Sequence, residues 1–225
     1  MIKGPILPLI VLCCSLAGTS SAGDWSVAVG SGPFLFGQFA RKSLIAGTPE
    51  STTKITTSLS AATRAGGTVD VEHGFSDRFA VRLESSFTKA PLSVKTGSGR
   101  GGVELGTGDI SVTSVILPLV FRINPRGAFR FHLMGGPAFA NYDVRRTASA
   151  QASNFLFGGS RGQYGVAGGA GLGWWLGQHI AVEGQIVDIV TSSPIARQEF
   201  TVATRGVSIP RPKNVHTTLA LRYRF

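Results

Sequence analysis

Hydrophobic and polar residues alternate with a period of two along most of the chain from Trp25 onward. This alternation is typical of β-strands that present one apolar face. The clearest example is the segment 214–225 (NVHTTLALRYRF), where the alternation continues to the last residue, Phe225. The pattern predicts eight strands: Trp25–Phe39, Thr68–Gly74, Phe79–Lys89, Ile110–Ile123, Phe129–Tyr142, Gln163–Leu176, Ile180–Val190 and Val215–Phe225.

Short and long connections alternate between these strands. The short ones contain turn-forming residues and lie at Phe75–Arg78, Asn124–Ala128 and Gly177–His179. The long ones are rich in Ser, Thr, Gly and Arg, lack helical periodicity and are predicted to be loops; they lie at about Ala40–Gly67, Pro91–Asp109, Asp143–Gly162 and Thr191–Asn214. Short turns at one end and long loops at the other predict an all-β fold, an eight-stranded antiparallel up-and-down barrel.

The two faces of the predicted strands differ in size and polarity. One face is bulky and apolar, as in Phe79, Val81 and Leu83, whereas the other mixes glycine and alanine with charged residues. The interior of an eight-stranded barrel is just wide enough for side chains to fill. A soluble barrel would need a polar exterior, which the glycine-rich segment 163–176 does not supply. We therefore expect the bulky face to contact lipid and the barrel to be transmembrane.

Aromatic residues fall at two levels if the first strand runs from the short-turn end toward the long loops. Trp25, Phe79, Phe121, Phe129, Trp174, Trp175, Tyr223 and Phe225 are near the short turns, and Phe34, Phe36, Phe39, Phe87, Phe139, Tyr142 and Tyr164 are near the long loops. Aromatic girdles that bracket an aliphatic band are typical of barrels in a bilayer. This distribution supports the transmembrane interpretation.

The N-terminus has the pattern of a secretory signal peptide. A basic start at Lys3 is followed by an apolar run at Ile6–Leu16, and Ser20 and Ala22 occupy the two positions that a signal peptidase recognises. We expect cleavage after Ala22, which leaves residues 23–225 as a single barrel domain. Both cysteines would leave with the signal, so the mature chain is expected to have no disulfide and no thiolate metal site.

Four segments resemble those of a known family: GGTVDVEHGFSDRFAVRLESS, FRFHLMGGPAFANYD, QYGVAGGAGLGWWL and the closing RYRF. With this layout the mature chain resembles the small eight-stranded OmpA-like or opacity-type outer-membrane barrels. It departs from them in a long first loop and in having no peptidoglycan-binding domain after the barrel. The resemblance implies a protein of the Gram-negative outer membrane, exported through the periplasm, whose Tyr223 and Phe225 form the assembly signal that the barrel assembly machinery recognises.

Strand alternation predicts that nine charged residues point into the lumen. They are Asp70, Glu72, Arg82, Glu84, Arg122, Arg130, Glu183, Arg222 and Arg224. Because isolated buried charges are very unfavourable, we expect these groups to pair into a network that closes the barrel. A lumen in which water simply solvates these charges is the alternative.

Basic residues dominate the predicted loops, and the chain has a formal net charge of +10 at pH 7. Candidates for contact with an anionic surface are Arg145, Arg146, Arg205, Arg211 and Lys213. In the outer membrane these loops would face lipopolysaccharide, whose phosphates guanidinium groups bind well. Nucleic acid is a poor alternative for an exported barrel. The expected partners are therefore outer-membrane lipid and lipopolysaccharide, with a monomeric protein.

Catalytic and cofactor chemistry has little support in the sequence. His216 and Thr218 resemble the His and Ser, two residues apart, of lipid A deacylases, but alternation directs His216 into the lumen and Thr218 is a weak substitute for Ser. The glycine-rich strings do not join a strand to a helix, and no His, Asp or Glu cluster has metal-ligand spacing. We predict no enzyme, cofactor or metal, and a structural and surface-interaction role. A narrow porin-like solute channel and a lipid A-modifying enzyme remain the alternatives.

Overall fold

The computed structural model describes residues 24–48, 51–98, 101–146, 158–194, 207–208 and 210–225. The expected signal peptide and its cleavage site lie outside these residues. In the described part of the chain, no helix is long and apolar enough to cross a membrane. The strands are β1 (Asp24–Phe36), β2 (Gln38–Thr48), β3 (Ser51–Ala61), β4 (Arg64–Gly74), β5 (Phe79–Ser98), β6 (Gly101–Ile116), β7 (Leu119–Arg122), β8 (Phe129–Arg146), β9 (Gly159–Trp175), β10 (Ile180–Thr191), β11 (Val207–Ser208) and β12 (Lys213–Arg224).

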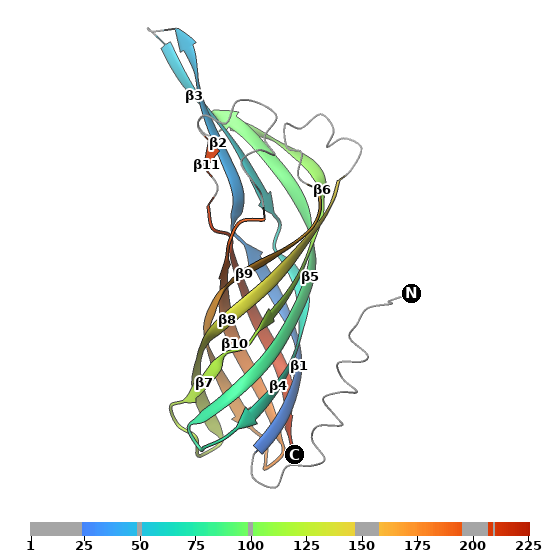
Figure 1. The fold of residues 1–225 in the computed structure, drawn as a ribbon, viewed down its shortest axis with the longest axis vertical. Helices are drawn as coiled ribbons and strands as arrows, with labels where there is room; N and C mark the ends of the chain where they lie inside the picture. Colours follow the sequence, from blue (N-terminus) through green and yellow to red (C-terminus); the bar gives the residue numbers. More distant parts are fainter. Residues whose placement is uncertain (1–23, 49–50, 99–100, 147–157, 195–206, 209) are drawn as a thin grey trace.

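These strands form a closed antiparallel ring of eight staves, which confirms the predicted fold class (Figure 1). Three staves consist of two strands each: β1 continues as β2, β3 as β4, and β6 as β7. The order of positions round the ring is β1, β4, β5, then β6 continued by β7, then β8, β9, β10 and β12. The ring closes between β12 and β1, whose register runs from Ser26 opposite Arg224 to Phe36 opposite Asn214. The C-terminal strand therefore seals the barrel.

The short connections and the C-terminus lie together at one end of the barrel, here called the short-turn end (Figure 1). Two of the turns contain glycines with positive φ, Gly127 at 101° and Gly177 at 146°. This backbone conformation strains any residue that has a Cβ. Asn124 strengthens its turn through its side-chain amide, which donates to the Phe129 carbonyl and accepts from the Phe131 N–H, both at 2.6 Å.

Two of the four predicted loops were wrong, because they are strands. Much of Ala40–Gly67 forms the β2–β3 hairpin, which projects beyond the barrel at the end opposite the short turns, the long-loop end. The segment Pro91–Asp109 continues β5 and begins β6, which pair as far as Ser98 opposite Gly101. These segments contain few large apolar residues, so their alternation is weak, but threonine favours the extended conformation. The other two predicted loops lie largely outside the described residues.

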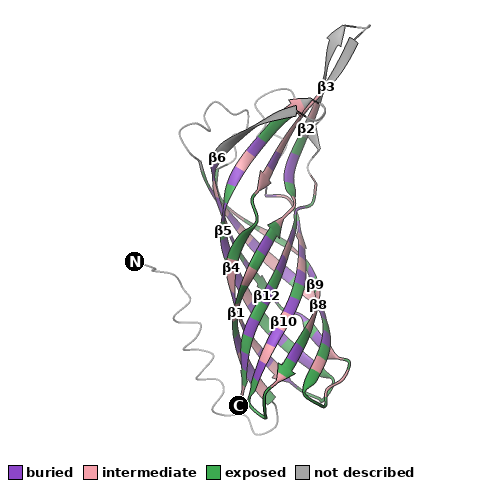
Figure 2. Cartoon of the chain, turned by 180° about the vertical axis from the view of Figure 1, so that it is seen from behind, coloured by how far each residue is buried: buried purple, intermediate pink, exposed green. Residues whose placement is uncertain are grey.

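Buried and exposed residues alternate along the staves, as the purple and green bands of Figure 2 show. The outward positions carry large apolar side chains, such as Val29, Leu83, Leu133, Ile186 and Leu219, which are all well exposed. A broad apolar exterior of this kind is typical of a barrel in a bilayer. The inward positions carry small, polar and charged residues together with a cluster of aliphatic ones.

The predicted aromatic girdles were only partly correct. Phe79, Phe129, Trp174, Tyr223 and Phe225 face outward near the short turns, and Phe87, Phe139 and Tyr164 do so near the long-loop end. By contrast, Trp175 points inward, as do Phe34, Phe39 and Tyr142, which are buried. The prediction was therefore wrong for these four residues, which face the lumen instead of lipid. Two consecutive tryptophans in a strand cannot both face lipid, because successive side chains point to opposite sides.

Candidate functional site

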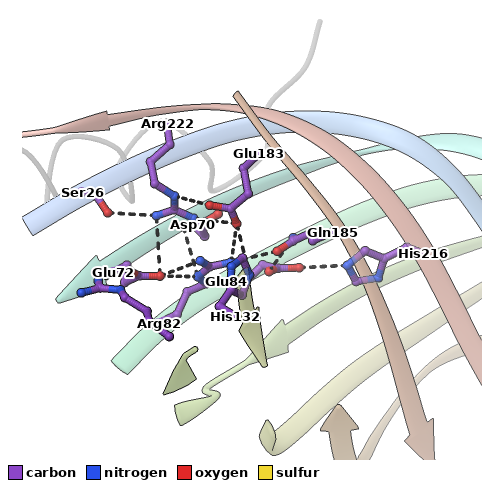
Figure 3. A network of polar contacts seen from close by, with 11 residues as sticks. Ser26, Asp70, Glu72, Arg82, Glu84, His132, Glu183, Gln185, His216 and Arg222 are labelled. Carbon is purple, nitrogen blue, oxygen red and sulfur yellow. Dashed lines mark hydrogen bonds and ion pairs between the residues drawn. The ribbon is translucent and has the colours of Figure 1, made fainter. Parts of the chain in front are cut away.

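The charged side chains of the lumen come from adjacent staves of the barrel. In the register of β4 and β5, Asp70 lies opposite Glu84, and Glu72 lies opposite Arg82. On the other side of β1, β12 carries Arg222 and β10 carries Glu183. All of these positions point inward, and the narrow interior brings them within hydrogen-bonding distance of one another (Figure 3).

Arg82 is the centre of this network and is only 1% exposed. Its Nε and Nη2 donate to Oε2 of Glu72 at 2.8 and 2.6 Å. Its Nη1 donates to Oε1 of Glu183 at 2.8 Å and to Oε1 of Gln185 at 2.8 Å. The guanidinium therefore connects β5 to β4 and, across the lumen, to β10. Charge-assisted hydrogen bonds of this kind are the strong ones in a medium that excludes water.

Arg222 forms a second centre and is 2% exposed. Its Nε donates to Oε2 of Glu183 at 2.7 Å, and its Nη2 donates to Oδ1 of Asp70 at 2.8 Å. Its Nη1 donates to the Ser26 hydroxyl at 2.9 Å. Because Glu183 accepts from both Arg82 and Arg222, the two centres form one network that crosses the lumen (Figure 3).

The network continues away from the short turns through an amide and an imidazole. Gln185 accepts from Arg82 and donates its Nε2–H to Oε2 of Glu84 at 3.0 Å. The other oxygen of Glu84 lies 2.9 Å from Nε2 of His216. The His216 ring stacks on Phe34, with 4.9 Å between the ring centroids. This contact marks the transition from the charged part of the lumen to its aromatic part.

The nine predicted lumen residues take two kinds of position. Six of them are buried and linked to one another: Asp70, Glu72, Arg82, Glu84, Glu183 and Arg222. Arg122 is partly buried and donates to Oε1 of Glu72 at 2.5 Å. Arg130 and Arg224 point inward at the mouth, where their hydrogen bonds go to backbone carbonyls of Gly127 and Gln178. In the structure, seven of the nine side chains are therefore linked to one another.

Gln185 and Ser26 belong to the network, although neither was predicted to do so from the sequence. Both are inward neighbours of predicted members, since Gln185 is two residues after Glu183 and Ser26 lies opposite Glu72. The alternation therefore contained the signal, but neither residue is charged. His216 was expected to face the lumen, and its side chain is buried there. Its neighbour on the same face, Thr218, is buried as well. Neither side chain reaches the lipid-facing surface, where a lipid substrate would lie.

A second layer fills the lumen beyond the charged network, toward the long-loop end. It is a cluster of buried apolar side chains: Phe39, Ala40, Leu59, Ala90, Leu92, Val94, Ile110, Val112, Ala140, Tyr142 and Val144. Its main polar group is the Tyr142 hydroxyl, which lies 2.7 Å from the Thr191 hydroxyl and accepts from Asn214 Nδ2 at 2.6 Å. The lumen is thus occupied by a charged layer and an apolar layer.

The predicted surface and assembly residues are placed as follows. Arg145 has a 78% exposed side chain, 3.6 Å from the Asp143 carboxylate, and Arg211 and Lys213 are exposed. Arg146 is the last residue of β8, but its side chain is outside the described part, as is the whole of Arg205. Tyr223 and Phe225 face outward, and their rings meet edge to face with 5.2 Å between centroids. The Phe225 N–H donates to the Trp25 carbonyl at 3.0 Å.

A closed ring of eight antiparallel strands with an apolar exterior and a filled interior defines a small outer-membrane β-barrel. No protein-family model and no curated protein sequence matches the chain. Among solved structures, it is similar to outer membrane protein OprG from Pseudomonas aeruginosa, with 15% identity, 91% of this chain and 96% of OprG covered, and a TM-score of 0.61. It is also similar to outer membrane protein AlkL, solved by solid-state NMR in DMPC lipid bilayers, with 14% identity, 92% of each chain covered and a TM-score of 0.52. These similarities confirm the fold.

Proposed function

We propose that this protein is an integral protein of the bacterial outer membrane with a structural and surface-interaction role. The observation that carries the proposal is the filled lumen. Arg82 and Arg222 cross it within one hydrogen-bonded network, and an apolar layer lies beyond them. Such an interior favours a stable anchor over a solute channel. The barrel plan then directs the short turns to the periplasm and the β2–β3 hairpin to the cell exterior.

We further propose that the exterior end contacts lipopolysaccharide or another anionic surface. Exposed basic residues support this proposal: Arg41, Arg64, Arg145, Arg211 and Lys213 are all exposed near that end. Among the described carboxylates there, Asp109 is 2.8 Å from Lys89, and Asp143 is beside Arg145. Each further basic group near an anionic surface contributes about 1 kcal/mol within a Debye length.

Binding of the folded barrel to purified lipopolysaccharide tests this second proposal. We expect the affinity to fall as salt rises from about 0.05 to about 0.5 M, because charge screening weakens contacts at the surface. The double variant Arg211→Ala/Lys213→Ala should bind about thirtyfold more weakly at low salt, since two basic groups are lost from the same end. Surface plasmon resonance with the barrel in detergent micelles measures both effects.

Arg126→Ala is the matched control, because Arg126 is 89% exposed but lies on a turn at the opposite end, next to Asp77. Its affinity should equal that of the unchanged protein. Salt-independent binding, or the same loss in the control as in the double variant, would show that these basic residues do not recognise the lipid.

We also propose that β12 is the strand through which the barrel assembly machinery recognises the chain. Two observations support this role. Tyr223 and Phe225 present their rings outward at the end of the strand, and β12 pairs with β1 to close the ring.

A further inference from the structure

The lumen has a recess of about 30 Å³ at its short-turn end. The recess reaches from exposed residues of the rim, such as Asp24, to the buried guanidiniums of Arg82 and Arg222. Its walls include the inward side chains of Arg122, Arg130 and other residues of β7, β8, β9 and β12. In the barrel plan this mouth opens to the periplasm. The charged network described above forms its floor.

The lining of the recess contains more positive than negative charge. Five arginines and three carboxylates contribute to it: Asp24, Glu72, Arg82, Arg122, Arg130, Glu183, Arg222 and Arg224. Glu72 already accepts from Arg82 and Arg122, and Glu183 already accepts from Arg82 and Arg222. The carboxylates of the floor are therefore used by the network, and the excess positive charge lies toward the rim.

Arg130 is the cation in this lining that lacks a carboxylate. Within the described part of the chain no Asp or Glu oxygen lies in ion-pair distance of it, and its Nε donates only to the Gly127 carbonyl at 3.3 Å. Its guanidinium lies 4.4 Å from the centre of the Trp175 ring. Arg224 lies over the same ring at 4.8 Å, with Asp24 at 3.7 Å from its Nη1. Trp175 thus holds two guanidiniums at the rim, where they repel each other.

His132 adds an imidazole to the wall of the recess. Its side chain is 6% exposed and lines the recess, and its Nε2 has no hydrogen-bond partner among the described residues. The nearest carboxylate oxygen, on Glu183, is 3.7 Å away, which is too far for a hydrogen bond. The ring is held against Gly171, where a Cβ would lie 2.5 Å from the same nitrogen. The ring is thus fixed between the β9 wall and the recess, below the rim arginines.

We propose that this recess binds a carboxylate group that is presented from the periplasm. Planar guanidiniums bind a carboxylate through parallel N–H···O bonds, and Arg130 is available to do so. The recess is small, about 30 Å³, and the planar two-oxygen carboxylate matches the fork of the Arg130 guanidinium. The negative charge would also relieve the repulsion between the guanidiniums of Arg130, Arg224 and Arg122.

Titration of the full barrel with acetate, followed by NMR, tests the proposal. The chain has three tryptophans, hence three indole N–H signals, and Trp175→Phe assigns the relevant one. We expect acetate to shift the Trp175 signal saturably when it replaces chloride at constant ionic strength. Acetamide, the uncharged analogue of the same shape, should not. Arg130→Gln should weaken acetate binding by at least about tenfold, because a charged hydrogen-bond donor is lost.

Arg126→Gln is the control, since Arg126 is as basic but does not line the recess. Arg130→Lys, which keeps the charge but loses the planar fork, should recover part of the affinity. The shift of gel migration on heating reports whether each variant has folded. Equal shifts with acetate and acetamide, equal affinity in Arg130→Gln and the unchanged protein, or tighter binding of inorganic phosphate would each overturn the proposal.

A pair of peptides distinguishes the two sources of a carboxylate. N-acetyl-alanyl-alanine carries a chain-terminal carboxylate, and its C-terminal amide does not. Tighter binding of the free acid than of acetate assigns the site to a chain end, because the rim around Trp175 then contacts the rest of the peptide. Equal affinities assign it to small free carboxylates. Both results support a carboxylate site, whereas binding of the amide as tightly as the acid contradicts it.

Discussion

The two layers of the lumen both fill the narrow interior of the barrel, one with charged and the other with apolar side chains. Toward the short turns, arginines and carboxylates fill the space, and each buried charge depends on its partners. Toward the long-loop end, aliphatic and aromatic side chains such as Phe39, Leu59 and Ile110 fill it without directional contacts. The charged layer therefore depends on the identity of every member, whereas the apolar layer depends mainly on total volume.

Small residues line the wall of the lumen that β9 contributes. Where β9 faces the network, the inward positions are Ala167, Gly169, Gly171 and Gly173. A Cβ at Gly171 would lie 2.5 Å from Nε2 of the His132 ring, so glycine at this position leaves room for that side chain. The apolar layer has no such run of glycines, and its side chains pack against one another from all sides.

The largest effect is expected from breaking the charged layer at its centre. Arg82→Met should destabilise the barrel by about 3–5 kcal/mol, because it leaves Glu72 and Glu183 buried with fewer partners. Urea unfolding in detergent, followed by tryptophan fluorescence, measures the change. Arg126→Met, on an exposed turn, should be within about 0.5 kcal/mol of the unchanged protein.

A second substitution shows whether stranded charge is the cause. Adding Glu72→Gln to Arg82→Met neutralises a carboxylate that then has only Arg122 and, at 3.9 Å, Arg222 as partners, so the double variant should recover part of the lost stability. Unchanged stability in Arg82→Met, or an additive loss in the double variant, would mean that water solvates these charges and that the layer does not close the lumen.

A smaller effect is expected at the main polar group of the apolar layer, the Tyr142 hydroxyl. Tyr142→Phe removes the hydroxyl that accepts from Asn214 and lies 2.7 Å from the Thr191 hydroxyl. Because those two buried groups then lose their partner, the variant should be about 1–3 kcal/mol less stable. Tyr164→Phe is the matched control, since Tyr164 faces outward and is 79% exposed. If the two variants have the same urea midpoint, the hydrogen bonds of the Tyr142 hydroxyl do not contribute to the stability of the barrel.

The charged layer was largely predictable from the sequence, because alternation with a period of two assigns each residue to a face. Asp70, Glu72 and Glu84 share the inward face with the buried Arg82 and Arg222, as their spacing requires. The alternation does not show the register between neighbouring strands, which decides which inward residues lie opposite each other. The sequence alone therefore gave no way to pair particular residues, or to see that Arg130 and Arg224 stay at the mouth.

The apolar layer was harder to predict, because its residues come partly from segments that were expected to be loops. Leu59, Leu92 and Val94 stand among serines, threonines and glycines, so few large residues mark the inward face. In a barrel that is closed by backbone hydrogen bonds, such segments need no strong apolar pattern to remain strands. Pairing with a neighbour, such as β3 with β5, determines their structure.

The smallest effect is expected inside the apolar layer. Ile110→Val removes one buried methylene from a side chain that is 1% exposed, so it should cost about 0.5–1.5 kcal/mol of unfolding free energy. No partner is left unsatisfied, and neighbouring aliphatic groups can relax into the space. Ile186→Val, at an exposed outward position on β10, should change stability less, since no packed cavity is created there. The same urea series measures both, and a loss at Ile110 as large as that of Arg82→Met would show that the apolar layer is as intolerant of change as the charged one.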